Sequence, residues 1–119
     1  MQDFRQLQVW QKSHELTLAV YRGTQSFPRE ELYGLTSQVR RSAVSIPANI
    51  AEGCCRSGDI EFGRFLQIAM GSASELECCL LLARDLELLN GADYERLVDA
   101  ATEVKRMLAS LIQRLKADG

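Results

Sequence analysis

Hydrophobic residues in the last quarter of the chain recur at alternating steps of three and four positions. The row consists of Tyr94, Leu97, Ala101, Val104, Leu108, Leu111 and Leu115. Because an α-helix completes a turn every 3.6 residues, this spacing places the whole row on one helix face. A seven-residue repeat held over three heptads is typical of a helix that packs lengthwise against other helices. We therefore expect a helix over about residues 93–117.

The same periodicity predicts three more helices, over about residues 4–25, 30–56 and 59–89. Phe27-Pro28 separates the first two, since proline disfavours helical geometry in the residue before it. The chain has only two prolines and eight glycines, too few for the regular turns of an all-β protein. Four long helices with short loops predict an all-α fold, an up-down-up-down four-helix bundle, with residues 1–119 forming one domain.

Glycine, proline and small residues indicate where these helices begin, end, bend and approach one another. The second helix should begin near Glu30 or Gly34, and Asn90-Gly91 is expected to end the third, because glycine closes a helix readily. Pro47 lies inside the second helix, where we expect a kink rather than an end. The small residues 71–74 at the centre of the third helix should allow close approach of a neighbour.

The second helix divides into three arcs when it is turned by 100° per residue. The predicted core arc consists of Leu35, Val39, Ala43, Ile46, Ile50 and Cys54. A second arc is mostly small or apolar and is therefore a candidate contact with another subunit: Arg40, Val44, Pro47, Ala48, Ala51 and Cys55. The third arc is polar and holds Gln38, Arg41, Ser45, Asn49, Glu52 and Arg56.

The polar arc has two interpretations, which the residues leave open. In the first, the arc is structural: it is either exposed to solvent or buried with its polar groups hydrogen-bonded to one another. In the second, it is a binding surface on which arginines bind phosphate or carboxylate groups. The candidate network residues are Gln38, Ser45, Asn49, Glu52 and Glu75. The candidate nucleic-acid-binding residues are Arg40, Arg41, Arg56, Lys12, Arg64 and Arg5.

Charge and hydropathy indicate which kinds of partner, nucleic acid or membrane, the protein is expected to bind. The chain carries 14 basic and 16 acidic residues, so its net charge of −2 does not indicate nucleic-acid binding. Residues 1–57 hold seven basic and five acidic side chains, so a polyanion would more readily meet the first half. No apolar run reaches the roughly 18 residues of a membrane span, and the start lacks the pattern of a signal peptide. We expect a cytoplasmic protein without a membrane partner.

The sequence offers little for catalysis or metal binding. The four cysteines form two adjacent pairs, 54–55 and 78–79, and neighbouring side chains diverge by about 100° on a helix instead of converging on one ion. The single histidine, His14, is expected to be a partly buried polar residue. Trp10, Tyr21, Phe62 and Phe65 lie at helical spacing and are expected in the core. We predict no enzyme activity, catalytic residue, cofactor, metal or small-molecule substrate, and reduced cysteines.

Four segments, in order, carry a family resemblance over about residues 4–90. They are FRQLQVWQK at 4–12, FPREELYGLTSQVRR at 27–41, SIPANIAEG at 45–53 and GSASELE at 71–77. These blocks resemble the four helix bundle protein family, also called the 23S rRNA-intervening sequence protein family. Cys54-Cys55 replaces the glycine that usually follows the Glu-Gly block.

The resemblance implies a bundle that assembles into a ring-shaped homo-oligomer, a pentamer. It also implies kinship with Avd, the positively charged pentameric accessory protein of diversity-generating retroelements, which binds nucleic acid and a reverse transcriptase. The leading hypothesis is a non-enzymatic binding or scaffolding protein associated with RNA, DNA or a nucleic-acid-binding protein. The alternative is a ring-forming protein–protein adaptor with no nucleic-acid affinity.

Overall fold

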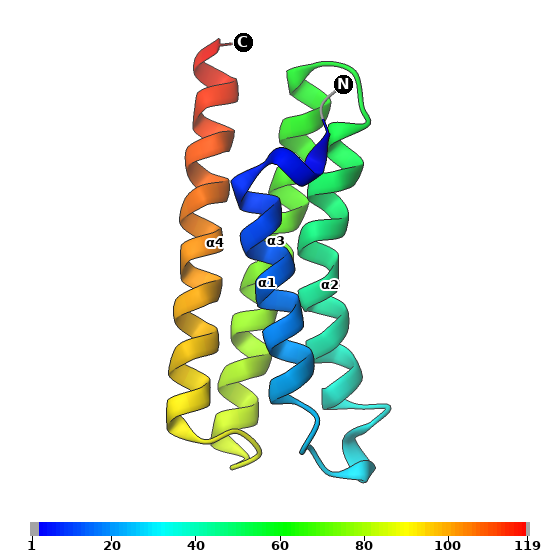
Figure 1. Ribbon diagram of the computed structural model, residues 1–119, viewed down its shortest axis with the longest axis vertical. Helices are drawn as coiled ribbons and strands as arrows, with labels where there is room; N and C mark the ends of the chain where they lie inside the picture. The colour runs from blue at the N-terminus through cyan, green and yellow to red at the C-terminus, as the bar shows by residue number, and fades with distance from the viewer. Residues whose placement is uncertain (1–2, 119) are drawn as a thin grey trace.

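The computed structural model describes residues 3–118, and within them it contains four long helices and no strand. The helices are α1 (Gln8–Gly23), α2 (Leu35–Cys54), α3 (Asp59–Asp85) and α4 (Gly91–Asp118). Two short 3-10 helices, η1 (Phe4–Gln6) and η2 (Arg29–Glu31), precede α1 and α2. The long helices run alternately up and down in a bundle of 46 × 22 × 20 Å (Figure 1). The predicted all-α four-helix bundle is confirmed.

The core follows the predicted periodicity. Ile46 and Ile50 of α2 are 0% exposed, and Leu97, Ala101 and Val104 of the heptad row are buried. Leu66, Leu76 and Leu80 of α3 and Leu16 and Val20 of α1 complete the centre. The heptad row in α4 therefore packs against α1 and α3 along most of its length.

Helix α2 continues through Pro47, as predicted, because α1 supplies a partner for the freed backbone group. Proline has no N–H, so the carbonyl of Ala43, four residues earlier, loses its helical donor. The hydroxyl of Thr17 in α1 lies 3.1 Å from this carbonyl oxygen and donates to it. The hydroxyl shares its single proton with the carbonyl oxygen of Ser13, which lies 2.8 Å away in α1 itself. One buried threonine thus joins α1 to α2 at the proline; the kink itself stays a prediction.

The first helix begins later than the sequence predicts, and the second begins at the later of its two predicted starts. Leu7 is extended (φ −79°, ψ 127°) and separates η1 from α1, which therefore starts at Gln8 and not at residue 4. No proline or glycine marks this break; the ring of Phe4 instead folds back to 5.0 Å from the ring of Trp10. Glu30 lies in η2, and α2 begins at Leu35, directly after Gly34.

The end of α3 also differs from the prediction. The helix ends at Asp85, where Glu87 adopts a left-handed conformation (φ 63°) and Leu88 donates to the carbonyl of Ala83 at 2.9 Å. This is a Schellman closure with glutamate in the position that glycine usually takes. Asn90 caps the next helix instead of ending this one, since its Oδ1 accepts from the N–H of Asp93 at 2.8 Å.

Helices α2 and α3 make the most extensive contact of the bundle. A methyl group added at Gly53 of α2 would lie 2.9 Å from Cδ1 of Phe62 and 3.0 Å from Cβ of Phe65, both in α3. Glycine at this position therefore sets how closely the two helices approach. At the centre of α3, Ser72 and Ala73 are buried, which confirms the close approach predicted for the small-residue segment, whereas Gly71 is exposed.

Candidate nucleic-acid interface

Four of the six predicted nucleic-acid-binding residues lie beside a carboxylate. These ion pairs are Arg5–Asp3 at 3.2 Å, Lys12–Glu103 at 3.5 Å, Arg56–Glu52 at 2.5 Å and Arg64–Glu61 at 3.1 Å. All four pairs are solvent-exposed, so each contributes little to stability. Each pair nevertheless reduces the positive potential that a polyanion would meet. The six residues do not form one continuous basic patch.

Arg56 and Arg64 are brought together by an aromatic ring. Both guanidinium groups lie 5.2 Å from the ring centre of Phe65, which projects from α3 at the end of α2. With Glu52 and Glu61 as their partners, the two arginines form a locally neutral cluster. A ring flanked by two paired cations is suited to structural packing.

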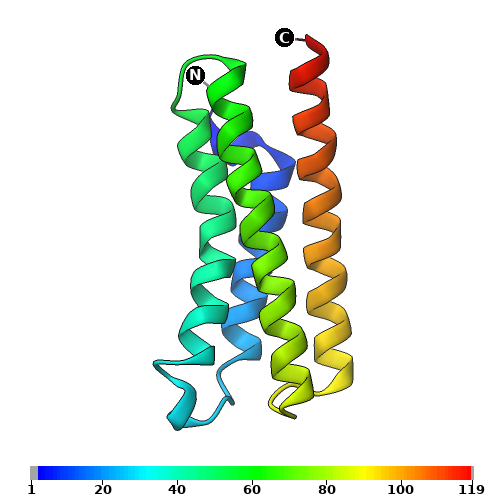
Figure 2. The ribbon, with the colours of Figure 1, turned by 180° about the vertical axis from the view of Figure 1, so that it is seen from behind.

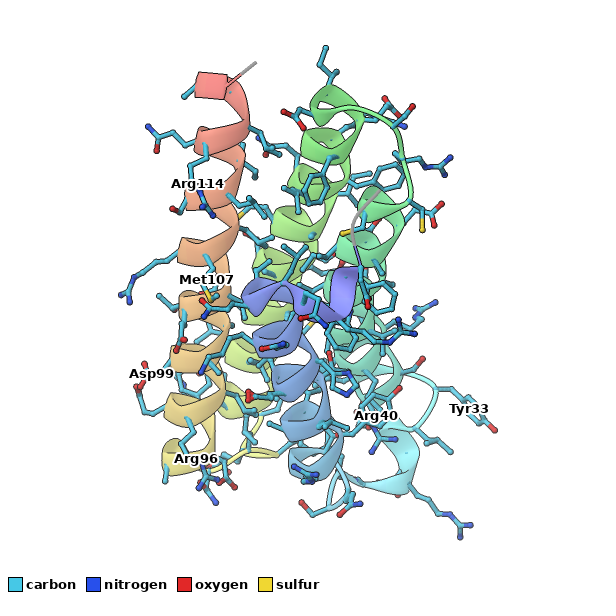
Figure 3. All side chains as sticks on the ribbon, turned by 45° about the horizontal axis from the view of Figure 1, so that its top comes forward. Tyr33, Arg40, Arg96, Asp99, Met107 and Arg114 are labelled. Carbon is cyan, nitrogen blue, oxygen red and sulfur yellow. The ribbon has the colours of Figure 1, made fainter. Side chains whose placement is uncertain are left out.

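Arg40 is held in a different way, by polar groups of α1. Its Nε donates to Oγ1 of Thr24 at 2.8 Å, and its Nη2 lies 3.4 Å from the carbonyl oxygen of Tyr21. The guanidinium carbon is also 4.7 Å from the ring centre of Tyr21. Figure 3 places Arg40 where α2 meets the end of α1, while Tyr33 projects away from the bundle. Arg40 is half-buried.

Arg40 and Arg41 are the two candidates without a carboxylate partner in the part of the chain that the structure describes. Arg41 is exposed on α2. Arg56 lies beyond the end of α2, and the thirteen helical steps from Arg41 to Cys54 alone span roughly 20 Å at 1.5 Å per residue. The unpaired basic charge of α2 is therefore confined to one end of that helix.

The predicted polar network exists in part. Oγ of Ser45 lies 2.7 Å from Oγ of Ser72, and Nδ2 of Asn49 donates to the carbonyl and hydroxyl oxygens of Ser45 at 2.8 and 3.0 Å. Gln38 and Glu75 are exposed and lie outside these hydrogen bonds. Ser72 belongs to this network but was not among the predicted members. Its position in the small-residue segment of the third helix, where a neighbour approaches closely, was the feature that could have identified it.

The burial of single residues tests the predictions made for His14 and for the four aromatic side chains. His14 is exposed rather than partly buried, and its ring stacks on that of Trp10 at 4.8 Å. Tyr21 is exposed and not in the core, because it lies on the outer side of α1 under Arg40. Phe62 is buried as predicted, while Trp10 and Phe65 are half-buried at the edge of the core.

The four cysteines are free thiols, and each adjacent pair contains one buried and one exposed member. Cys54 and Cys79 are buried, whereas Cys55 and Cys78 are exposed. Burial raises the pKa of the Cys54 thiol and of the Cys79 thiol, with smaller contributions from neighbouring groups. Both buried thiols are therefore held in the protonated form, which is weakly reactive.

The outer surface of α3 is unusually apolar for the solvent side of a bundle helix. We call Ile68, Gly71, Cys78, Leu82 and Leu86, the residue that follows α3, the α3 outer face; all five are exposed and recur at helical spacing. Exposed Glu75 lies among them at the same spacing and is the one charged residue between Ile68 and Leu86 on this face. Of the ten large hydrophobic residues exposed in the described part of the chain, four belong to α3 and a fifth, Leu86, follows its last residue. Helix α3 is long and apolar enough to cross a membrane by length and composition, since a stretch of 18 of its residues has a mean hydropathy of 1.3. Core helices of soluble proteins share this property. Figure 2 shows this helix in front of the bundle, beside α2.

These features define a class of protein: an all-helical four-helix bundle with an apolar outer face and seven surface ion pairs in its described part. The sequence matches the family model "23S rRNA-intervening sequence protein" over residues 5–110. The chain belongs to the 23S rRNA-intervening sequence protein family, and the resemblance of the sequence blocks is confirmed.

A solved structure shares the fold. It is a protein of unknown function from the S23 ribosomal protein family of Bacteroides thetaiotaomicron VPI-5482, with a TM-score of 0.82 and 29% sequence identity. The similarity covers 88% of this chain and 95% of that chain. Among curated proteins, none matches the chain.

Proposed function

We propose that the protein is a non-enzymatic, self-assembling scaffold whose copies associate through the α3 outer face. The observation that carries this proposal is the apolar character of α3 on both sides. Leu66, Leu76 and Leu80 fill the core, while Leu82 and Leu86 are exposed on the other side. Exposed apolar side chains that gather along one helix mark a surface that is normally covered by a partner.

The small-residue arc of α2 offers a second surface for contact between copies. Val44 is exposed, as are Ala48 and Cys55 on the small-residue arc of the same helix. Short side chains allow a second copy to approach closely, and the exposed valine adds apolar area. A homopentameric ring is the assembly implied by the family resemblance, and the cytoplasm is the compartment we propose for it.

Sedimentation equilibrium of the purified protein tests this proposal. We expect a mass several times the 13.3 kDa of one chain at micromolar concentration, with five copies as the specific expectation. Leu82→Glu should reduce the mass to that of one chain, because it places a charge in the middle of the apolar face. Leu18→Glu is the matched control, since Leu18 is comparably exposed (41%, against 49% for Leu82) but lies on α1.

Two results would overturn the scaffold proposal. One is a parent protein that sediments at the mass of a single chain. The other is a Leu18→Glu variant that dissociates as fully as Leu82→Glu does. Circular dichroism of both variants shows whether the helices are retained, so that loss of assembly is distinguished from loss of folding.

A second candidate function is binding of nucleic acid, and Arg40 and Arg41 favour it. Both lie on α2 without a carboxylate partner among the described residues, and a ring would repeat them once in every subunit. This basic array would relate the protein to nucleic acid or to a nucleic-acid-binding protein, as the resemblance to Avd implies. The pairing of Arg5, Lys12, Arg56 and Arg64 makes it the second candidate.

Salt dependence separates the two candidates. Phosphate contacts release counterions, so the logarithm of the affinity falls against log salt by about 0.9 per contact for duplex DNA. Arg41→Gln should reduce this slope for structured RNA and duplex DNA, whereas Arg64→Gln, which removes an already paired charge, should leave it nearly unchanged. A parent protein that binds neither polymer at low salt leaves the protein–protein adaptor as the function.

A further inference from the structure

A polar cavity lies where the segment between α1 and α2 folds back on the bundle. Its volume is about 290 Å³, and its lining includes Arg29, Arg40, Thr24 and Thr36 together with apolar groups of the connecting segment. No acidic residue is among those that line it. The cavity therefore combines two cationic side chains with two hydroxyl groups at one end of the molecule.

Thr36, one of the lining residues, carries an unsatisfied polar atom beneath the surface of the cavity. It is the second residue of α2, its side chain is 4% exposed, and its Oγ1 has no hydrogen-bond partner. This oxygen is the one buried side-chain polar atom without a partner in the described part of the chain. Leaving a buried hydroxyl unpaired is costly, so such an atom calls for an external partner.

The guanidinium of Arg40 is fixed in position but not neutralised. Its Nε and Nη2 face Thr24 and the carbonyl of Tyr21, which leaves N–H groups free for a further acceptor. Arg29, in η2, is exposed at the cavity. Within residues 3–118, neither arginine has a carboxylate at ion-pair distance.

We propose that this cavity binds the phosphate group of a small molecule. Arg40 and Arg29 donate to its oxygens, and rotation of the Thr36 side chain brings its hydroxyl to the cavity as a third donor. Glu31 lies outside the lining, and its Oε1 already accepts from the N–H of Leu35 at 3.2 Å. The bound phosphate therefore depends on the two arginines and the threonine.

The size of the cavity sets the class of ligand. A water molecule takes about 30 Å³ of liquid volume, so about 290 Å³ holds a phosphate group together with the first atoms esterified to it. Three donors in different directions suit a tetrahedral phosphate better than a planar carboxylate, which offers only two oxygens. The site is independent of the α3 outer face and of the assembly proposed above.

Thermal unfolding of the full chain tests this proposal. At constant ionic strength and protein concentration, replacing chloride by inorganic phosphate should raise the midpoint temperature, because a ligand of the folded state stabilises it. Acetate should have a smaller effect. Amide chemical shifts of Thr36 and its neighbours, measured by NMR during the phosphate titration, should identify the site directly.

Three variants make the test specific. Thr36→Val keeps the shape of the side chain and removes the unpaired hydroxyl, so the phosphate-free protein should unfold at the same or a higher temperature while phosphate affinity falls about tenfold. Arg40→Gln should abolish the phosphate effect. Arg41→Gln removes the same charge from the adjacent, exposed position and should preserve it.

The proposal is overturned if phosphate and chloride give the same midpoint, or if Arg41→Gln weakens the effect as much as Arg40→Gln does. Stabilisation by acetate as large as that by phosphate would also overturn it, since the site would then belong to carboxylates. If Arg40→Gln fails to fold, Thr36→Val and the NMR titration decide the question alone.

Discussion

The hydroxyl of Thr17 lies 3.1 Å from the carbonyl oxygen of Ala43, the group that Pro47 leaves without a donor. A side chain of α1 thereby completes a backbone hydrogen bond that α2 cannot make itself. The two residues form a pair across the helix interface, and their effects on stability should depend on each other.

Thr17→Val should therefore lower the free energy of unfolding by about 1–3 kcal/mol, because the carbonyl of Ala43 loses its donor in a buried position. In a Pro47→Ala background the same substitution should cost less, since the N–H of residue 47 then bonds to that carbonyl. Urea unfolding of the four proteins in this cycle gives the coupling energy. Equal costs in both backgrounds would show that the hydroxyl does not substitute for the missing N–H.

Gly53→Ala should destabilise the protein by about 1–2 kcal/mol, because the added methyl group meets Phe62 and Phe65 at 3.0 Å or less. Gly63→Ala is the matched control on α3: its methyl group meets no atom within 4 Å, so greater helix propensity should stabilise the protein by roughly 0.5–1 kcal/mol. Chemical denaturation at one protein concentration measures both. Stabilisation by both substitutions would contradict the role given to Gly53.

Ile50→Ala should lower the free energy of unfolding by about 2–5 kcal/mol, since Ile50 is fully buried and the substitution leaves a cavity. Leu18→Ala, at an exposed position of α1, should cost less than about 1 kcal/mol. The comparison uses the denaturation midpoint and slope of each variant. A loss below half a kilocalorie per mole at Ile50 would be inconsistent with the packing of α2.

The cysteines should react in two classes with a thiol-specific alkylating reagent under native conditions. Cys55 and Cys78 are exposed and should react first, while Cys54 and Cys79 should react only as the protein opens. The raised pKa of each buried thiol shifts its thiolate to higher pH, so alkylation at these two sites should require more alkaline solution than that of an ordinary thiol. Mass spectrometry of the labelled peptides gives the order.

The proposed assembly also predicts how the alkylation rate of Cys78 depends on protein concentration. Cys78 lies on the α3 outer face, so its alkylation should slow as the protein concentration rises and copies associate. Cys54 and Cys79 serve as internal standards for unfolding during the same experiment. A Cys78 rate that is independent of protein concentration in an assembled sample would place the contact elsewhere.

The interior of each helix was predictable from the sequence, and several helix ends were not. Periodicity places Ile46, Ile50 and Leu97 in the core because burial follows directly from the repeat of apolar residues. Leu7 breaks the first helix without a proline or glycine, since the contact between Phe4 and Trp10 decides the local backbone. Helix ends that depend on tertiary contacts leave no local signal.

The connection between α3 and α4 shows a second reason why a helix end was not predictable from the sequence. Asn90-Gly91 carries the composition of a helix end, yet Asn90 caps the helix that follows. Asparagine serves both purposes, because its side chain binds backbone N–H groups at a helix start and its backbone tolerates the left-handed region. Glu87, which ends α3, has no such preference.

The candidate interface was predictable in residue type but only partly in environment. Glu52–Arg56 and Glu61–Arg64 are spaced four and three residues apart, so their pairing was available from helical geometry. The pairing of Lys12 with Glu103 joins α1 to α4 and depends on how the bundle closes. The same is true of the hydrogen bond between Ser45 and Ser72.

The local pairing of surface charges has a consequence for how this molecule meets others. Opposite charges a few ångströms apart form short dipoles, whose potential decays faster with distance than that of isolated charges. Long-range electrostatic steering raises association rates only where charge of one sign accumulates over a surface. We therefore expect encounters with partners to proceed at the ordinary rate set by diffusion and orientation. Selectivity then arises after contact, from the fit of apolar surfaces.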